Sequence, residues 1–339
     1  MEHSNEIELM TLRDTPEDAQ HEFVPKTFDD YLGQVSLKEK LSIYTQAAKM
    51  RNEPLDHLLF FGPPGLGKTT LAQIMAQVMN VGIKICSGPM LERTGDLVAI
   101  LSSLEPRDIL FVDEIHRMPM AVEEVLYSAM EQFRVDVIVG QGAGAKSINL
   151  PLHPFTLVGA TTKSGMISAP LRSRFGITER LDFYQDDELR QIVLQNARFL
   201  NINITDDAAL LIGSTARGTP RIAKKILRRV RDIAQVTNKN VADKALTEEA
   251  LLFLGIDHEG LTTLDNLILE KIVVNFNGGP VGLETLCSLV GEDKETLENV
   301  NEPFLLRKGY LEKSPRGRQI PAQKLPFFKR RFLGQETLF

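Results

Sequence analysis

One stretch decides the fold: Gly62-Pro63-Pro64-Gly65-Leu66-Gly67-Lys68-Thr69-Thr70. It fits the phosphate-binding pattern G-x-x-x-x-G-K-[ST]. The apolar run before it, Leu58–Phe61, predicts a buried parallel strand, and the helical spacing of the apolar residues after it predicts a helix: Leu71, Ile74, Met75 and Val78. Strand, glycine loop and helix in this order place backbone N–H groups at a helix N-terminus, where a polyphosphate is stabilised. The alternative is a glycine-rich turn with a chance lysine.

Two residues of this loop and two acids further along the chain would carry the chemistry. Lys68 would place a cation on the β- and γ-phosphates, and the Thr69 hydroxyl would bind Mg²⁺. The apolar run Ile109–Val112 predicts a strand that ends in two carboxylates, Asp113 and Glu114. Metal-assisted phosphoryl hydrolysis needs one acid to hold Mg²⁺ through water, here Asp113, and one to polarise the attacking water, here Glu114. The pattern therefore predicts an ATPase site. His116 is interpreted as a local hydrogen-bonding residue.

Other polar residues follow apolar runs along the chain. Thr162 ends the run Phe155-Thr156-Leu157-Val158-Gly159-Ala160-Thr161-Thr162 and could bond the γ-phosphate or the lytic water, or act only as a turn or cap hydroxyl. Arg174 ends a short helix in Leu171–Gly176, where it could reach a neighbouring subunit and stabilise transition-state charge. Arg221 in Gly218-Thr219-Pro220-Arg221 begins a basic helix that could fold over the phosphates.

Composition places the chain in a broad class. It has 339 residues, 43% hydrophobic and 25% charged, which is ordinary for a globular cytosolic protein of two or three domains. No run is long enough for a membrane span, and the acidic N-terminus does not resemble a signal peptide, so we expect a cytoplasmic protein without a membrane partner. The two cysteines, Cys86 and Cys287, are far apart and are expected to be reduced core thiols.

The net charge of -6 conceals an asymmetry between the ends of the chain. Residues 1–30 are rich in acids, with only Arg13 and Lys26 as cations, and residues 1–20 are expected to be disordered. Between Leu305 and Arg331 the many lysines and arginines are accompanied only by Glu312. A basic end on an acidic protein indicates a polyanionic partner, most simply nucleic acid, although a solvated tail is the alternative.

The order of the predicted elements indicates an α/β domain followed by helices. Strand-like and helical runs alternate from Leu58 to about Phe183, which is typical of a parallel sheet covered by helices. The strand candidates are Leu58–Phe61, Ile83–Cys86, Ile109–Val112 and Phe155–Val158. Arg134–Val139 and Ser147–Leu152, joined by Gln141-Gly142-Ala143-Gly144-Ala145, predict an inserted β-hairpin.

The sequence pattern of the second half of the chain predicts two smaller units. Asp186–Leu254 is helical, and one predicted helix places Ile222, Ile226, Val230 and Ile233 on one face, with the remaining faces covered by Lys224, Lys225, Arg228, Arg229 and Arg231. We interpret those basic residues as a solvated face, with DNA contact as the alternative. Three helices are then expected, Leu264–Phe276, Val281–Val290 and Lys294–Leu306, before a basic hairpin at Gly309–Ile320, which is typical of a winged helix.

The order of these motifs resembles an AAA+ ATPase. LRSRFG and GTPR belong to that AAA+ order. The chain is also similar to the RuvB family over nearly its whole length, from about Pro25 to about Gln319, and the segments that carry this similarity are GPPGLGKTT, FVDEIHR, GATT, PRGR and YLGQ. The resemblance implies an ATP-dependent DNA translocase that drives branch migration of Holliday junctions in recombination and repair. It implies an acidic N-terminus (1–20), a large AAA+ domain (21–184) with the GATT strand between the other two motif strands of a five-stranded parallel sheet, a small helical lid (185–256) and a winged helix with a basic tail (257–339).

The resemblance also implies roles for individual residues. The implied catalytic residues are Lys68, Asp113, Glu114, Thr162 as sensor 1, Arg174 as the arginine finger and Arg221 as sensor 2. The residues implied to contact ATP or ADP are Phe23, Val24, Gly62, Gly65, Gly67, Lys68, Thr69, Thr70, Glu131, Gln132, Phe133, Arg174, Tyr184 and Arg221. Mg²⁺ would be held by Thr69 and Asp113, and DNA would contact Lys313, Arg316 and Arg318. One position departs from the family, which usually reads Arg-Pro-Lys where this chain has Val24-Pro25-Lys26. Phe23 and Val24 are therefore expected to give only backbone and apolar contact.

The implied partners are double-stranded DNA at four-way junctions, a homo-hexameric ring, a RuvA-like junction-binding protein held by the hairpin at residues 134–152, and a RuvC-like resolvase in the wider complex. Two rival classes share the AAA+ core. A clamp-loader subunit carries its arginine finger in Ser-Arg-Cys, whereas this chain reads Ser173-Arg174-Phe175. A nucleotide-switched DNA-binding protein of the origin-recognition type would hydrolyse ATP slowly and would not move along DNA. A peptide unfoldase is disfavoured because no aromatic-hydrophobic-glycine pore loop follows the second strand.

Overall fold

A computed structural model describes residues 23–139 and 146–334. The described residues form two compact units. The sheet unit comprises 23–188 and 219–221, and the helical unit comprises 189–218 and 222–334. The expected disordered N-terminus and the turn of the inserted hairpin lie outside the described residues, and the domain boundaries stay a prediction. Within the described ranges, no helix combines the length and apolar character needed to cross a membrane.

The sheet unit is built on a five-stranded parallel sheet in the order β2-β3-β6-β1-β7. Its strands are β1 (Leu58–Phe61), β2 (Ile83–Ser87), β3 (Ile109–Asp113), β6 (Thr156–Thr161) and β7 (Ile177–Arg180). The expected parallel sheet is confirmed, and so is the position of β6 between β1 and β3. β6 runs further than the expected strand Phe155–Val158, because Gly159, Ala160 and Thr161 continue to pair with β1.

The register of the sheet brings the functional segments to one edge. Phe61 at the end of β1 pairs with Thr161 at the end of β6, and Val112 near the end of β3 pairs with Gly159. The glycine loop, the Asp113-Glu114 pair and Thr162 each follow one of these strands. Ligands of open α/β sheets bind at this carboxyl edge, so the residues singled out from the sequence start from neighbouring positions.

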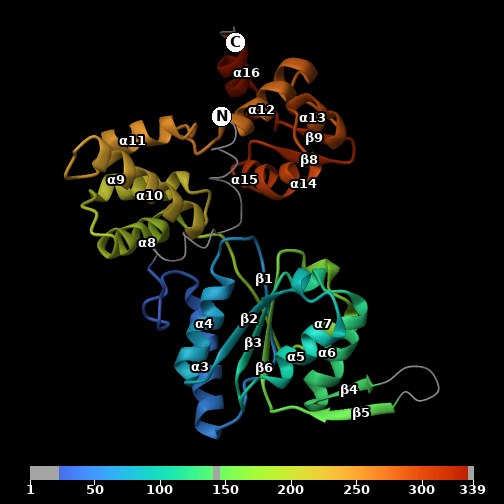
Figure 1. The fold of residues 1–339 in the computed structure, drawn as a ribbon. Helices are drawn as coiled ribbons and strands as arrows, with labels where there is room; N and C mark the ends of the chain where they lie inside the picture. The colour runs from blue at the N-terminus through green and yellow to red at the C-terminus, as the bar shows by residue number, and fades with distance from the viewer. Residues whose placement is uncertain (1–22, 140–145, 335–339) are drawn as a thin grey trace. The chain divides into compact units, whose positions relative to one another are not determined.

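Helices cover both faces of the sheet (Figure 1). One face carries α3 (Val35–Arg51) and α4 (Lys68–Met79), and the other carries α5 (Thr94–Ser102), α6 (Met120–Gln132) and α7 (Ala169–Arg172). The core on the second face joins strand residues to helix residues, among them Leu110, Leu157, Leu97, Leu126 and Leu171. The predicted helix after the loop is confirmed as α4, whose apolar positions 71, 74 and 75 are fully buried.

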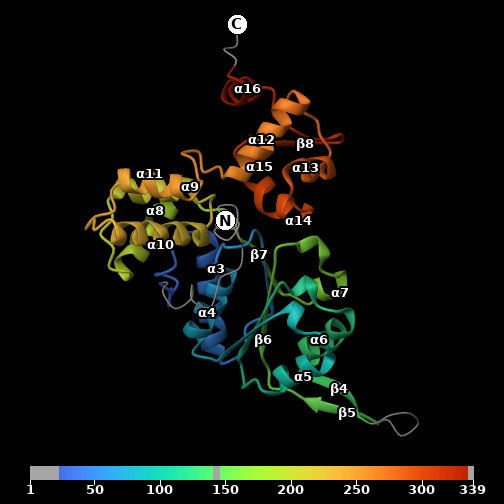
Figure 2. The same ribbon diagram turned by 45° about the horizontal axis from the view of Figure 1, so that its top comes forward.

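The inserted hairpin is confirmed as β4 (Arg134–Val139) and β5 (Lys146–Pro151), paired antiparallel outside the main sheet. It extends away from the sheet beside α5 and α6 (Figure 2). The second strand starts and ends one position before the expected segment Ser147–Leu152. The predicted core thiols are free as expected, but Cys86 and Cys287 are both only half-buried.

The helical unit begins with a bundle of helices: α8 (Asp186–Phe199), α9 (Asp206–Thr215), α10 (Pro220–Val236) and α11 (Lys244–Phe253). The apolar face of α10 is confirmed, since Ile222, Ile226 and Val230 are buried. The interpretation of its basic residues is wrong for Lys225 and Arg228, which are only 7% and 5% exposed. The buried face of α10 is wider than the isoleucine spacing indicated, because small and apolar residues at 223 and 227 are buried as well.

The remainder of the helical unit has the elements of a winged helix: α12 (Thr263–Phe276), α13 (Leu283–Val290), α14 (Lys294–Thr296), a π-helical turn η5 (Leu297–Asn301), α15 (Glu302–Arg307), the hairpin β8 (Glu312–Ser314) and β9 (Gly317–Gln319), and α16 (Leu325–Leu333). The three helices and the hairpin were expected, although the π turn interrupts the third. The segment read as a basic tail folds as α16. Its Phe328 is fully buried and meets the Tyr310 ring edge-on, with centroids 5.2 Å apart.

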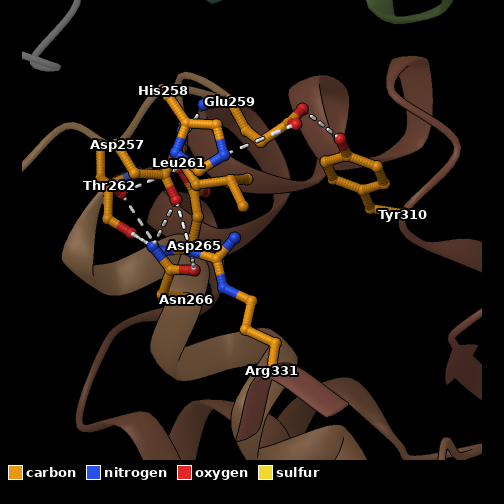
Figure 3. Close-up of polar contacts among 9 residues, drawn as sticks. All are labelled: Asp257, His258, Glu259, Leu261, Thr262, Asp265, Asn266, Tyr310 and Arg331. Carbon is orange, nitrogen blue, oxygen red and sulfur yellow. Dashed lines mark hydrogen bonds and ion pairs between the residues drawn. The ribbon is translucent and has the colours of Figure 1, made fainter. Parts of the chain in front are cut away.

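Side-chain hydrogen bonds order the segment that precedes α12 (Figure 3). One oxygen of Asp257 accepts the backbone N–H groups of Glu259 and Leu261, both at 2.9 Å. The other oxygen accepts the guanidinium of Arg331 at 2.5 Å, and Tyr310 donates to Glu259 at 2.5 Å. Asn266 lies against the same Asp257 carboxylate at 3.2 Å. The start of the winged helix is therefore fixed by residues from α12, α16 and the turn before β8.

Candidate functional site

The glycine loop leads directly into α4, whose first residue is Lys68. The Lys68 ammonium donates to the carbonyls of Gly62 and Pro63, both at 2.9 Å, and its side chain is 7% exposed. Burial lowers the pKa of Lys68 to about 8, against the opposing effect of the Asp113 and Glu114 carboxylates. The Lys68 ammonium thus lies against the backbone at the start of the loop.

Two glycines in the loop are required by conformation and by space. Gly65 and Gly67 have φ of 76° and 96°, which L side chains rarely adopt. A Cβ on Gly67 would lie 2.6 Å from the Tyr31 hydroxyl, and one on Gly65 would lie 3.1 Å from the Cβ of Arg221. These are the places where the backbone must turn closely, as the sequence pattern predicted.

The two acids at the end of β3 lie in different surroundings. Asp113 accepts the N–H of Glu114 at 2.9 Å, and burial raises its pKa above the ordinary value. Glu114 itself has φ of 46°, a strained conformation for a residue with a side chain. The left-handed turn separates the carboxylates, so that Asp113 continues the strand while Glu114 is directed towards the end of β6.

Glu114 is held by two neighbours at the end of β6 and β3. Thr162 donates its hydroxyl to Glu114 at 3.1 Å, and the Nδ1 atom of His116 lies 3.1 Å from the same carboxylate oxygen. His116 also shares a hydrogen bond of 2.9 Å with Thr161. The interpretation of His116 as a local hydrogen-bonding residue is confirmed, and its pKa is lowered by burial. Thr162 contacts the proposed base directly, an arrangement that the sequence did not indicate.

A pair of tyrosines lies beneath the loop. Tyr184 donates to the hydroxyl of Tyr31 at 2.8 Å, and Tyr31 donates to the carbonyl of Leu66 at 2.9 Å. Both rings are buried, and burial raises the pKa of each phenol. Tyr184 was expected near the nucleotide, whereas Tyr31 was missed, although it begins the quoted YLGQ segment. The structure therefore places Tyr184 beside the loop, both through Tyr31 and directly, since its hydroxyl also donates to the carbonyl of Leu66 at 3.3 Å.

Arg221 belongs to the sheet unit although it lies far along the chain. Its backbone N–H is 3.5 Å from the carbonyl of Gly65, and its charge acts on Lys68 and Asp113. Lys68, Asp113, Glu114, Thr162 and Arg221 are thus gathered around one loop. Phe23 is half-buried and Val24 is 48% exposed, and their expected nucleotide contact stays a prediction.

A second group of expected residues gathers at the ends of α6 and α7. The guanidinium of Arg174 lies 3.0 Å from the carboxylate of Glu131 and 4.3 Å from the ring centroid of Tyr127. Gln132 ends α6, and Phe133 caps it in a left-handed conformation with its ring against Phe155. Glu131 and Arg174 are therefore brought to each other, and their contact with a nucleotide stays a prediction.

Burial and donor chemistry at the loop fit a magnesium ion. The candidate ligands are the half-buried Thr69 and Asp113, a hydroxyl and a carboxylate. Mg²⁺ prefers oxygen ligands, and it is commonly held by one or two protein groups together with phosphates and water. Thr70 follows in the first turn of α4, where its N–H faces the loop with those of its neighbours.

Two of the three basic side chains expected to contact DNA are paired with acids in the hairpin's surroundings. Arg318 donates its Nε to Glu302 at 2.6 Å, and its Nη2 lies 3.3 Å from Glu298. The Lys313 ammonium lies 2.5 Å from the other oxygen of Glu302. The count of one acid, Glu312, holds for residues 305–331. In the fold, α15 and the π turn bring two further acids, Glu302 and Glu298, from outside that range. Arg316, by contrast, is exposed at the turn.

A parallel sheet with a glycine loop, two acids and a threonine at its carboxyl edge defines an ATPase of the P-loop, AAA+ class. Comparison with known families agrees along the chain. The Holliday junction DNA helicase RuvB P-loop domain matches residues 23–181, the RuvB AAA lid domain matches 184–257, and the RuvB C-terminal winged helix domain matches 258–329. The chain belongs to the RuvB family.

Individual relatives are similar over almost their full length. The Holliday junction branch migration complex subunit RuvB of Fusobacterium nucleatum is 48% identical over 330 residues, covering 97% of this chain and 96% of that protein. The RuvB subunit of Enterococcus faecalis is 52% identical over 294 residues, with 87% of each covered. The solved structure of the Thermotoga maritima RuvB Holliday junction branch migration motor superposes with a TM-score of 0.80 at 45% identity, covering 93% of this chain and 99% of that one.

Proposed function

We propose that this chain is the ATP-driven motor subunit of a Holliday junction branch migration complex. The observation that carries the proposal is that all three RuvB domains match this chain in order along its length. The site geometry agrees, because the glycine loop, the two acids and Thr162 lie at one edge of the sheet. Branch migration breaks one base pair for each that it forms, so ATP hydrolysis serves to give direction and to overcome mismatches.

The residues of the loop and of the sheet edge have separate roles in ATP hydrolysis. Lys68 places its charge on the β- and γ-phosphates, and Thr69 with Asp113 would hold Mg²⁺, whose charge would offset that of the phosphates. Glu114 polarises the attacking water. In this structure its carboxylate is engaged by Thr162 and His116. A carboxylate can accept about four hydrogen bonds, so Glu114 can keep both contacts and still accept one from the attacking water.

Arg174 acts on the nucleotide of a neighbouring subunit in a homo-hexameric ring. Among the described residues its guanidinium contacts Pro170, Glu131 and Tyr127, and none of these belongs to the glycine loop or to the Asp113-Glu114 pair, which supports delivery in trans. An arginine supplied in this way stabilises the charge that spreads over the transferred phosphoryl group. Arg221 approaches the same phosphates from its own subunit, since it lies against Gly65.

Partners attach to elements outside the ATPase site. The wing, with Lys313, Arg316 and Arg318, contacts the phosphate backbone of double-stranded DNA, because a motor that moves along DNA must tolerate any sequence. The hairpin β4–β5 docks a RuvA-like junction-binding protein, supported by its extension from the sheet (Figure 2). A RuvC-like resolvase joins the wider complex.

Replacing Glu114 by glutamine tests the proposal. The Glu114→Gln chain should bind ATP with wild-type affinity and hydrolyse it about 10²–10⁴-fold more slowly, because the water loses its base. Glu124→Gln, an exposed change on α6, is the matched control and should leave turnover unchanged. Turnover by Glu114→Gln within a few-fold of wild type would assign the base to another residue. Slow wild-type hydrolysis without strand movement would favour a nucleotide-switched DNA-binding protein.

A further inference from the structure

Arg174 is held in a definite place by its own subunit. Its Nη1 donates to the carbonyl of Pro170 at 2.6 Å, and its Nη2 lies 3.0 Å from Glu131. The guanidinium carbon lies over the Tyr127 ring, 4.3 Å from its centroid, well within the roughly 6 Å reach of a cation–π contact. The side chain is only 21% exposed. Three different contacts therefore fix a residue that would act on another subunit.

The contacts differ in how firmly they are anchored. Glu131 is 52% exposed, so its ion pair with Arg174 is screened by solvent. The Tyr127 ring is fixed from behind, because its hydroxyl donates to the Glu123 carboxylate, which is only 7% exposed. The hydroxyl of Ser168 donates to the same carboxylate oxygen. The ring is therefore the more rigid of the two supports for the guanidinium.

The same network also fixes the helix that presents the arginine. Ser168 is the N-cap of α7 and accepts the N–H of Leu171 at 3.2 Å. Glu123 and Tyr127 lie one turn apart on α6, so one buried carboxylate joins the start of α7 to the ring that supports Arg174. The helices α6 and α7 lie side by side (Figures 1 and 2). The backbone and the side chain of the arginine are thus oriented by one anchor.

We propose that Tyr127 is a positioning residue for Arg174, and that its ring preorganises the guanidinium for the neighbouring subunit's nucleotide. This inference rests on the proposed action of Arg174 in trans. A flexible arginine must lose side-chain freedom at the moment of reaction, and a group that is already ordered loses less. Each of the two terminal nitrogens of Arg174 carries two N–H groups and makes one of the polar contacts described above, so N–H groups remain for a phosphoryl group. The ring thus holds the guanidinium without using all its donors.

Subunit mixing tests the role of Tyr127 separately from its folding. Tyr127→Leu removes the ring, and the assembled protein should lose about tenfold in kcat while each subunit keeps wild-type affinity for a fluorescent ATP analogue. Mixing Tyr127→Leu with Asp113→Asn subunits should restore activity, because an intact pocket then meets an intact finger. Mixing Tyr127→Leu with Arg174→Ala should not, because both are altered on the finger side. A merely misfolded subunit would not be rescued on one side only.

Two controls keep the outcomes distinct. Tyr127→Phe retains the ring and should keep kcat within about threefold of wild type, since the cation–π contact survives. Tyr44→Leu removes another half-buried tyrosine, on α3, and should leave kcat unchanged. Mixing Arg174→Ala with Asp113→Asn tests the action in trans itself.

If the Arg174→Ala mixture recovers but Tyr127→Leu turns over at the wild-type rate, or is not rescued by Asp113→Asn, the role of Tyr127 is overturned and the trans finger stands. A Tyr127→Phe chain as slow as Arg174→Ala would also overturn it, even if Tyr127→Leu failed to fold. An Arg174→Ala mixture that stays inactive would overturn both proposals.

Discussion

The ion pair of Arg318 with Glu302 predicts that Arg318→Ala destabilises the winged helix before it reports on DNA binding. The Glu302 side chain is 3% exposed, and Arg318 donates to it at 2.6 Å. The hydrogen bond to Glu302 raises the pKa of Arg318, so the arginine stays charged. Removing one partner of a buried pair costs roughly 3–5 kcal/mol. We take the lower end, about 3 kcal/mol, because Lys313 remains on the other oxygen of Glu302 at 2.5 Å.

Hydrogen exchange of the full-length chain, followed by mass spectrometry, measures this loss. The amides of α12 and α13 should exchange about 100-fold faster in Arg318→Ala, which corresponds to about 3 kcal/mol in the free energy of opening. Arg316→Ala, an exposed change in the same hairpin, is the control and should alter that free energy by less than about 0.5 kcal/mol. Arg318→Met combined with Glu302→Leu removes both charges and should recover most of the loss.

This result decides how DNA-binding variants are interpreted. Lys313→Ala and Arg316→Ala keep the Arg318–Glu302 pair, so each should make the salt dependence of DNA affinity shallower by about one unit per lost phosphate contact. Protection of α12 in Arg318→Ala equal to that of wild type would refute the reasoning, because Glu302 would then not need its partner.

Two further predictions follow from buried charges. Burial lowers the pKa of Lys68 to about 8, and bound phosphates should raise it again. Without Mg²⁺ the affinity for ATP should therefore be nearly constant between about pH 7, where the terminal phosphate of ATP is ionised, and pH 8, and it should fall about tenfold per pH unit above pH 8. Calorimetry in two buffers at about pH 9 should detect uptake of one proton, and a pH-independent affinity would contradict the assignment. Arg217 pairs with Asp265, which is 0% exposed. Arg217→Met should therefore lower the free energy of opening of both α9 and α12 by about 3 kcal/mol, measured by hydrogen exchange. A change confined to one of the two helices would contradict this prediction.

Sequence could predict the ATPase core because its signals are local. Gly62 to Thr70 combine positive-φ glycines, a lysine and hydroxyls at fixed spacing, and only a strand on one side and a helix on the other satisfy that pattern. Asp113 and Thr162 end apolar strands, and the rule that parallel strands share a carboxyl edge brings them together. The order of the sheet came from the family resemblance and not from the residues alone.

The contacts that modify the site could not be predicted, because they join residues distant in sequence through the packed fold. Glu302 meets Arg318 only once α15 packs beside the hairpin, and sequence counting assigned a single acid to that region. Tyr127 supports Arg174 across two helices. Lys225 has the spacing of an exposed residue, yet burial by its neighbours places it in the interior. Each case depends on tertiary packing, on which helical periodicity carries no information.

The most direct measurement of the central claim is branch migration of a synthetic four-way junction by the purified chain with a RuvA-type partner. With ATP, the wild-type chain should convert the junction to separated duplex products, and Glu114→Gln under the same conditions should leave it intact while remaining bound. Product formation at equal rates by the two chains, or by the wild-type chain without ATP, would contradict the claim that hydrolysis at the Glu114 site drives the movement.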